Sequence, residues 1–242
     1  MKIPNAARRQ KSPFSAKLFL QTRWAAMNFR QYLETKYVAA CDMQRGIHRD
    51  PQMIAMLRGG QPDVNLVQTW MRDYGLFQGI TAENRVAIAD RFLEFSAQHD
   101  LFDHEPSANE IQAMYAELFE ALYGTVPRGW VSATSKLLWC LYPETVVIYD
   151  AFVHRTLSVM QCLDDSLAGF PRIGEPPSIR GINDIQIAVQ HYMNYQAMVR
   201  ELLATHSQLL QELRTLHAEP YPYDVRIMDK LLWMIGNLRE AY

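Results

Sequence analysis

The 242-residue chain is predicted to be all-α, for three reasons. Apolar residues recur at intervals of three and four over most of its length, which is the spacing of amphipathic helices. Only residues 145–149 (TVVIY) are rich enough in β-branched residues for a strand, and with no partner strand they favour an extended connection. Hydrophobic residues make up 49% and charged residues 21%, which is typical of a globular protein and not of a disordered chain.

The first half of the chain contains four segments with helical periodicity. They cover residues 19–43, 64–77, 83–99 and 109–124. Ser107 stands just before the last of them and Glu110 follows three residues later, which predicts an N-cap with a capping box. A loop is expected at GQPD, which begins at Gly60.

The second half is predicted to be helical as well. A helix is expected from Val131 to Leu141, since Pro143 disfavours helical geometry in the residue before it. Asp150 opens the next apolar run and is placed at or near a helix N-cap. The long stretch 169–181, rich in glycine and proline, is expected to be a loop. One helix or a broken pair is then predicted over 183–217, with a closing helix over 223–242.

The charge distribution divides the chain into a basic end and an acidic body. Residues 1–36 hold eight Lys or Arg and one acid, whereas the rest holds 16 basic and 25 acidic residues. We therefore treat 1–36 as a basic N-terminal arm with a first helix, and 37–242 as a single all-α domain with a subdomain boundary near 169–181. A basic end indicates a surface that meets an anion such as phosphate. A solvated tail explains the same composition.

Targeting and metal signals are weak in this sequence. No apolar run approaches the roughly 20 residues needed to cross a bilayer, and the N-terminus lacks the apolar region of a secretory signal. Three cysteines occur without metal-ligand spacing, which favours reduced thiols and a cytoplasmic protein. The histidines are scattered, and no metal site is expected. The basic N-terminus leaves a transit peptide as an alternative.

The chemistry-bearing residues are Lys136 and Asp150, fourteen positions apart on consecutive predicted helices. Trp139 and Cys140 share the helix face of Lys136, so its ammonium group is expected to be partly desolvated. Desolvation lowers the pKa of a lysine, and a neutral amine can form a Schiff base with a carbonyl carbon. Structural roles also suffice for each residue alone. The Lys136 stem can pack on apolar surface with its head in water, and Asp150 can simply cap a helix.

Aromatic residues surround this pair in the sequence. Trp130, Trp139 and Tyr149, together with Tyr142 and Phe152, could stack on a flat ring, or they could belong to the core. His154 lies near the proposed site on the helix that Asp150 opens, and is either a substrate contact or a surface residue.

Two stretches resemble the helix-hairpin-helix DNA glycosylase superfamily. SKLLWCLYPETVVIYDAFVHRTL (135–157) is similar to its lysine–helix–loop–aspartate segment, most of all in the divergent bacterial branch related to 8-oxoguanine glycosylases. RIMDKLLWMIG (226–236) is similar to that branch's C-terminal helix. The likeness covers about 40 residues directly. The G-hydrophobic-G turn that usually holds a phosphate in this family is absent from GTVPRGWVSATSK (124–136).

The resemblance implies a mechanism and a set of site residues. A nucleotide would be flipped from DNA into a cleft between two helical subdomains. Lys136 would attack the anomeric carbon, displace the base and form a Schiff base that allows strand cleavage. Asp150 would stabilise the cationic sugar and orient or activate the nucleophile. Amides around 132–135, including Ser135, would anchor a phosphate with help from Arg128. The implied partner is DNA, with no membrane, no metal, no cofactor and a monomeric enzyme.

Other functions remain open at the sequence level. A monofunctional glycosylase would use Asp150 and a water in place of Lys136. A non-enzymatic helical subunit of a repair or phage-defence complex would explain the amphipathic helices and the net charge of −2. An aldolase-like enzyme would use Lys136 on a small carbonyl substrate.

Overall fold

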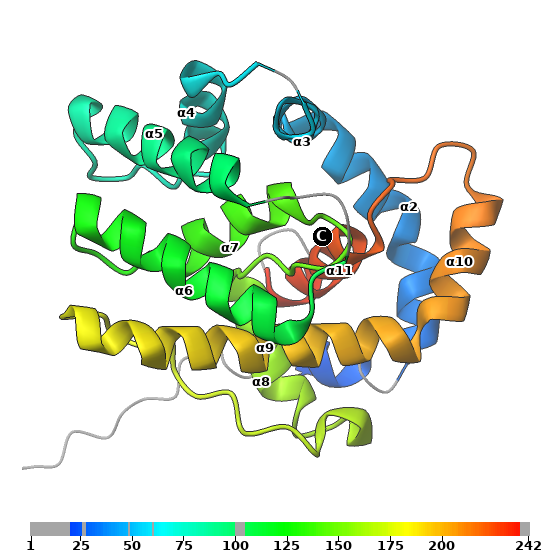
Figure 1. The fold of residues 1–242 in the computed structure, drawn as a ribbon. Helices are drawn as coiled ribbons and strands as arrows, with labels where there is room; N and C mark the ends of the chain where they lie inside the picture. Colours follow the sequence, from blue (N-terminus) through cyan, green and yellow to red (C-terminus); the bar gives the residue numbers. More distant parts are fainter. Residues whose placement is uncertain (1–19, 26–27, 48, 60, 100–104, 238–242) are drawn as a thin grey trace, which may run out of the picture.

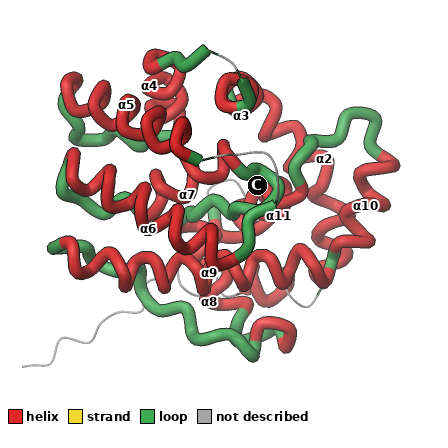
Figure 2. Tube along the Cα trace, in the orientation of Figure 1, coloured by secondary structure: helices red, strands yellow, loops and turns green. Residues whose placement is uncertain are grey.

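The fold is taken from a computed structural model, shown in Figures 1 and 2. It describes residues 20–25, 28–47, 49–59, 61–99 and 105–237. These residues form helices and loops with no strand among them, so the predicted all-α class is confirmed for this part of the chain. The TVVIY segment is an extended connection, as predicted, and its residues 146–149 are buried.

Residues 20–25 are helical, and longer helices follow them along the chain. They are α2 (Phe29–Ile47), α3 (Asp50–Leu57), α4 (Val64–Asp73), α5 (Ala82–Gln98), α6 (Ala108–Thr125), α7 (Val131–Leu141), α8 (Ala151–Met160), α9 (Ile185–Thr205), α10 (Ser207–Leu216) and α11 (Asp224–Gly236). Two 3₁₀ turns, Asp165–Leu167 and Ile182–Asp184, flank the long loop near 169–181.

Local sequence signals account for several helix boundaries. Ser107 and Glu110 form the predicted capping box at the start of α6, with hydrogen bonds of 3.3 and 2.8 Å. The stretch 183–217 is a broken pair, because α9 ends at Thr205 and α10 begins at Ser207. After α4 the chain turns back through Gly75, whose φ of 67° favours glycine.

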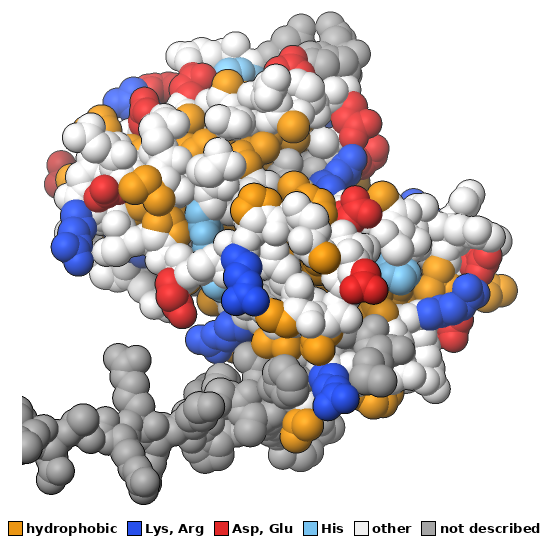
Figure 3. Space-filling model, turned by 90° about the horizontal axis from the view of Figure 1, so that it is seen from below, with side chains coloured by type: hydrophobic (Ala, Val, Ile, Leu, Met, Phe, Trp, Pro, Cys, Tyr) orange, Lys and Arg blue, Asp and Glu red, His pale blue; other side chains and the backbone are white. Residues whose placement is uncertain are grey.

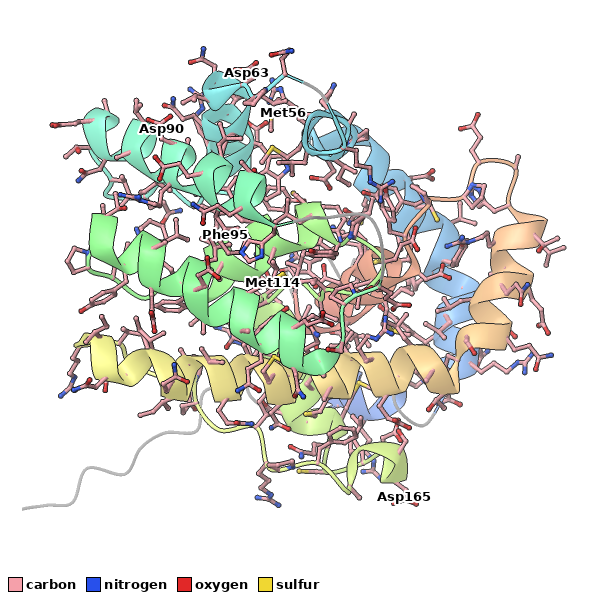
Figure 4. The ribbon with its side chains drawn as sticks, viewed as in Figure 1. Met56, Asp63, Asp90, Phe95, Met114 and Asp165 are labelled. Carbon is pink, nitrogen blue, oxygen red and sulfur yellow. The ribbon has the colours of Figure 1, made fainter. Side chains whose placement is uncertain are left out.

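The helices pack in two series that meet around α11. In the first, α4, α5 and α6 pack in sequence, α3 contacts α4 and α7, and α7 contacts α6. In the second, α2, α8 and α9 pack against α11, and α10 packs against α2. Contacts between α6 and α9 join the two series. The core is continuous: Phe95 of α5 and Met114 of α6 (Figure 4) are both buried in it.

Helices from early and late parts of the described chain, α2 and α11, pack side by side in the structure. The Tyr32 hydroxyl on α2 donates a 2.8 Å hydrogen bond to the Leu231 carbonyl on α11. Helix α2 also continues without a break across the boundary that the sequence analysis set between residues 36 and 37. Its first part is therefore packed into the same core as the remainder. Residues 1–19, most of the predicted basic arm, lie outside the described part of the chain.

Surface features of the described part give few direct indications of function. On the face drawn in Figure 3, Lys and Arg side chains are interspersed with Asp and Glu. None of the described helices combines the length and the apolarity that a bilayer crossing requires. No cluster of three or more His, Cys, Asp or Glu placed to hold a metal ion occurs among the described residues.

Helices α8 and α11 approach so closely that Gly236 is sterically required. A Cβ atom at this position would overlap the backbone carbonyl oxygen of Phe152 and lie 2.8 Å from the Thr156 hydroxyl oxygen. The Thr156 hydroxyl already bridges the two helices, with hydrogen bonds of 3.1 Å to the Phe152 carbonyl and 3.0 Å to the Leu232 carbonyl. Since the obstructing atom is backbone, a larger residue would have to push the helices apart.

Gly236→Ala is therefore expected to destabilise the protein by about 1–3 kcal/mol, the usual cost of overpacking. Gly124→Ala is the matched control, because a Cβ at Gly124 meets nothing within 4 Å. That control should be neutral or stabilising by roughly 0.5–1 kcal/mol, since alanine is favoured in helices. Urea unfolding followed by circular dichroism measures both. Equal stability of the two variants would contradict the close α8–α11 contact.

Candidate active site

A pocket of about 360 Å³ opens where the two helix series meet. It brings together α2, the end of α4, α7, the segment before α8, and α11. Its lining residues are Met43, Asp73, Tyr74, Ser132, Lys136, Ile148, Asp150, Arg226, Asp229, Lys230 and Trp233. The two predicted catalytic residues, Lys136 and Asp150, thus line one pocket, and its volume lies in the roughly 300–1,000 Å³ range of ligand sites.

Lys136 is held at the pocket wall by two acceptors. Its side chain is 5% exposed, and Nζ donates to Ser132 Oγ at 2.7 Å and to the Tyr149 carbonyl at 3.0 Å. Ser132 lies one turn earlier on α7, and its hydroxyl also donates to the Tyr149 carbonyl at 3.1 Å. The extended TVVIY connection supplies this carbonyl because its backbone, free of helical bonding, runs beside α7.

The surroundings of Lys136 shift its protonation equilibrium toward the neutral amine, relative to a lysine in water. Burial lowers the pKa of Lys136, while the negative charges of Asp150 and Asp229 partly oppose this change. A neutral amine carries two N–H groups, which match the two acceptors Ser132 Oγ and the Tyr149 carbonyl. The nitrogen lone pair is then left without a described protein partner, in a side chain that lines the pocket. This is the state that a nucleophile requires.

Asp150 is the N-cap of α8, as the sequence predicted. Its Oδ1 accepts a 2.8 Å hydrogen bond from the Phe152 amide, and the residue is half-buried. The Asp150 amide donates to the Tyr195 hydroxyl on α9 at 3.4 Å. The cap fixes the carboxylate at the N-terminus of α8, beside the pocket. A fixed anion next to a pocket can stabilise a positive charge that develops there.

A buried ion pair on α11, absent from the residues expected from the sequence, also lines the pocket. Arg226 Nη1 donates to Asp229 Oδ2, and both residues are more than nine-tenths buried. Arg226 Nη2 donates to the Tyr74 hydroxyl at 3.0 Å, and Tyr74 donates in turn to the buried Asp50 carboxylate at 2.9 Å. This network fixes the arginine in place.

A signal for these residues exists in the sequence. RIMDKLLWMIG places Arg226, Asp229 and Lys230 on a helix that is otherwise apolar. Charges at three-residue spacing on a buried helix indicate a buried pair. Burial raises the pKa of Asp229 to about 6, although Arg226 acts in the opposite direction.

The predicted aromatic contacts lie in the core, outside the pocket lining. Trp130 is buried, and its indole N–H donates to the Val126 carbonyl at 2.8 Å. Trp139 is fully buried, with Arg226 over its ring. Tyr149 is buried as well, and its hydroxyl lies 3.1 Å from Nε2 of His191. Their side chains face the packed interior because large aromatic rings gain most by leaving water. Only the backbone of Tyr149 contributes, through the carbonyl that holds Lys136.

The three predicted polar contacts also lie outside the pocket lining. The Ser135 hydroxyl accepts from the Tyr149 amide at 2.9 Å and donates within α7, so it ties the extended connection to the helix. Arg128 lies over the Trp130 ring and donates to the Gln78 carbonyl at 3.0 Å. His154 is buried and not on the surface, and its Nε2 lies 2.9 Å from the Gly174 carbonyl. Each of the three is engaged in a structural contact.

Comparison with known proteins does not assign a family or a function to the chain. No family model, no curated protein and no solved structure matches the chain.

Proposed function

We propose that this protein is a DNA glycosylase that excises a damaged or modified base flipped out of the duplex. The observation that carries the proposal is that Lys136, a buried lysine with a lowered pKa, shares one small pocket with the helix-capping carboxylate of Asp150. A bifunctional mechanism follows, in which Lys136 forms a Schiff base with the sugar and permits strand cleavage. Asp150 stabilises the positive charge that develops on the sugar.

The position of the pocket supports base flipping. It lies between the series α3–α7 and the series formed by α2 and α8–α11, which we propose as the two helical subdomains. A flipped nucleotide would enter between them while the rest of the DNA stays on the surface. The rings of Tyr74 and Trp233 belong to the lining, and aromatic rings of this kind can stack on a base.

The proposal is tested with duplex oligonucleotides that carry a panel of damaged and modified bases. Free base is measured by liquid chromatography and mass spectrometry, and covalent protein–DNA adducts are measured after borohydride reduction. At least one base should be released, with an adduct from the same substrate. Base release that is unaffected by both Lys136→Gln and Asp150→Asn would contradict the proposal.

A Schiff-base enzyme acting on a small carbonyl compound is a second candidate, because it would use the same buried amine. This candidate predicts borohydride trapping with small aldehydes or ketones and no salt-dependent affinity for DNA. Binding to a fluorescent duplex at two salt concentrations separates the two functions.

A further inference from the structure

We propose that Asp229 is the general acid that donates a proton to the departing base. This inference rests on the proposed glycosylase function and gives a catalytic role to a residue on α11. It follows from the position of Asp229 in the pocket and from the different bonding of its two carboxyl oxygens.

The two oxygens of Asp229 have different surroundings. Oδ2 accepts the hydrogen bond from Arg226, which fixes the orientation of the carboxyl group. Oδ1 is buried and has no hydrogen-bond partner among the described residues. The residue is 2% exposed and lines the same pocket as Lys136 and Asp150. An unpaired buried carboxyl oxygen is costly, and a hydrogen bond between a ligand and Oδ1 would remove this cost.

The groups around Asp229 come from every part of the pocket. They are Arg226 and Lys230 on α11, Lys136 on α7, Asp150 at the start of α8, Tyr195 on α9, and Asp73 and Tyr74 at the end of α4. From α2 the lining residue is Met43, which does not titrate. Burial and Asp150 favour the protonated acid, whereas Arg226, Lys136 and Lys230 favour the anion, and the pKa of Asp229 is raised to about 6. Such a carboxyl group exchanges protons near neutral pH.

The resulting step balances protons and electrons. The lone pair of neutral Lys136 forms the bond from Nζ to the anomeric carbon while the glycosidic carbon–nitrogen bond breaks. The electron pair of the broken bond goes to the base nitrogen. The proton of the Asp229 carboxylic acid then transfers to the base, which leaves neutral, and Asp229 becomes a carboxylate. Asp150 neither gains nor loses a proton in this step, and it lies beside the cationic sugar.

Base release and the trapping of an abasic site are two reactions of the proposed enzyme. Comparing them distinguishes a general acid from a residue that only maintains the structure. Asp229→Asn is expected to slow base release in single turnover by about 10²–10⁴-fold, the usual contribution of a general acid. Borohydride trapping on DNA that is already abasic should stay within about twofold of wild type, because no base departs. Asp90→Asn is the matched control, since Asp90 is an exposed carboxylate on α5 (Figure 4), and it should leave both rates unchanged.

The pH dependence of the two reactions of the wild-type protein gives a second test. It does not depend on whether the Asp229→Asn variant folds. The ratio of base release to abasic-site trapping should fall as pH rises through about 6, because the acid form of Asp229 is lost. Taking this ratio cancels the contribution of Lys136 to both reactions. A flat ratio, or equal losses of both reactions in Asp229→Asn, overturns the inference. Wild-type protein that neither releases a base nor traps an abasic site overturns the glycosylase function itself.

Discussion

Replacing Lys136 with glutamine is expected to abolish the borohydride-stable adduct with DNA and to slow base release by roughly 10³-fold or more. Glutamine keeps an N–H donor, one bond closer to the backbone, for the acceptors Ser132 Oγ and the Tyr149 carbonyl. It has no nucleophilic lone pair, and the Schiff base cannot form. Gel electrophoresis after reduction measures the adduct, and chromatography measures the released base.

Lys36→Gln is the matched control for this variant. Lys36 is an exposed lysine on α2, so the substitution removes the same charge without touching the pocket. It should retain both adduct formation and base release. If Lys136→Gln still gave the wild-type yield of adduct, another amine would be the nucleophile and the role of Lys136 would be excluded.

Asp150→Asn is expected to reduce base release by about 10²–10³-fold, comparable with the loss of one preorganised electrostatic contact in other enzymes. The asparagine lacks the negative charge that stabilises the cationic sugar. It can still accept the hydrogen bond from the Phe152 amide, because asparagine and aspartate cap helices about equally well. The free energy of unfolding should therefore change by less than about 1 kcal/mol.

Two measurements on this variant separate catalysis from stability. Single-turnover base release gives the catalytic effect, and urea unfolding gives the change in stability. A large loss of stability with a proportional loss of activity would show that Asp150 serves only as a cap. Unchanged base release would likewise contradict the proposed role.

The helices could be predicted from the sequence because their signals are local. The limits of α7 follow from apolar periodicity and Pro143, and the start of α6 follows from Ser107 and Glu110, whose interaction spans three residues. The N-cap position of Asp150 was predicted for the same reason. The break at His206 was harder to place, since apolar residues continue on both sides.

The candidate site could be predicted only in part, because it is assembled from distant segments. Lys136 and Asp150 were expected together since the chain connects them by a short turn. Arg226 and Asp229 lie 76 and 79 residues after Asp150, and their approach depends on how α11 packs against α8. Trp139 was expected at the substrate for its aromatic ring, but the direction of a side chain depends on tertiary packing, which sequence periodicity does not specify.

The most direct test of the central claim is to identify the residue that carries the trapped DNA. Wild-type protein is reduced with borohydride in the presence of a substrate oligonucleotide, digested with trypsin and nuclease, and analysed by mass spectrometry. The sugar remnant is expected on Lys136. A remnant on Lys230, which lines the same pocket, or on the N-terminal amine would contradict the account. Base release with no adduct on any residue would contradict it as well, and would indicate hydrolysis by water with Asp150.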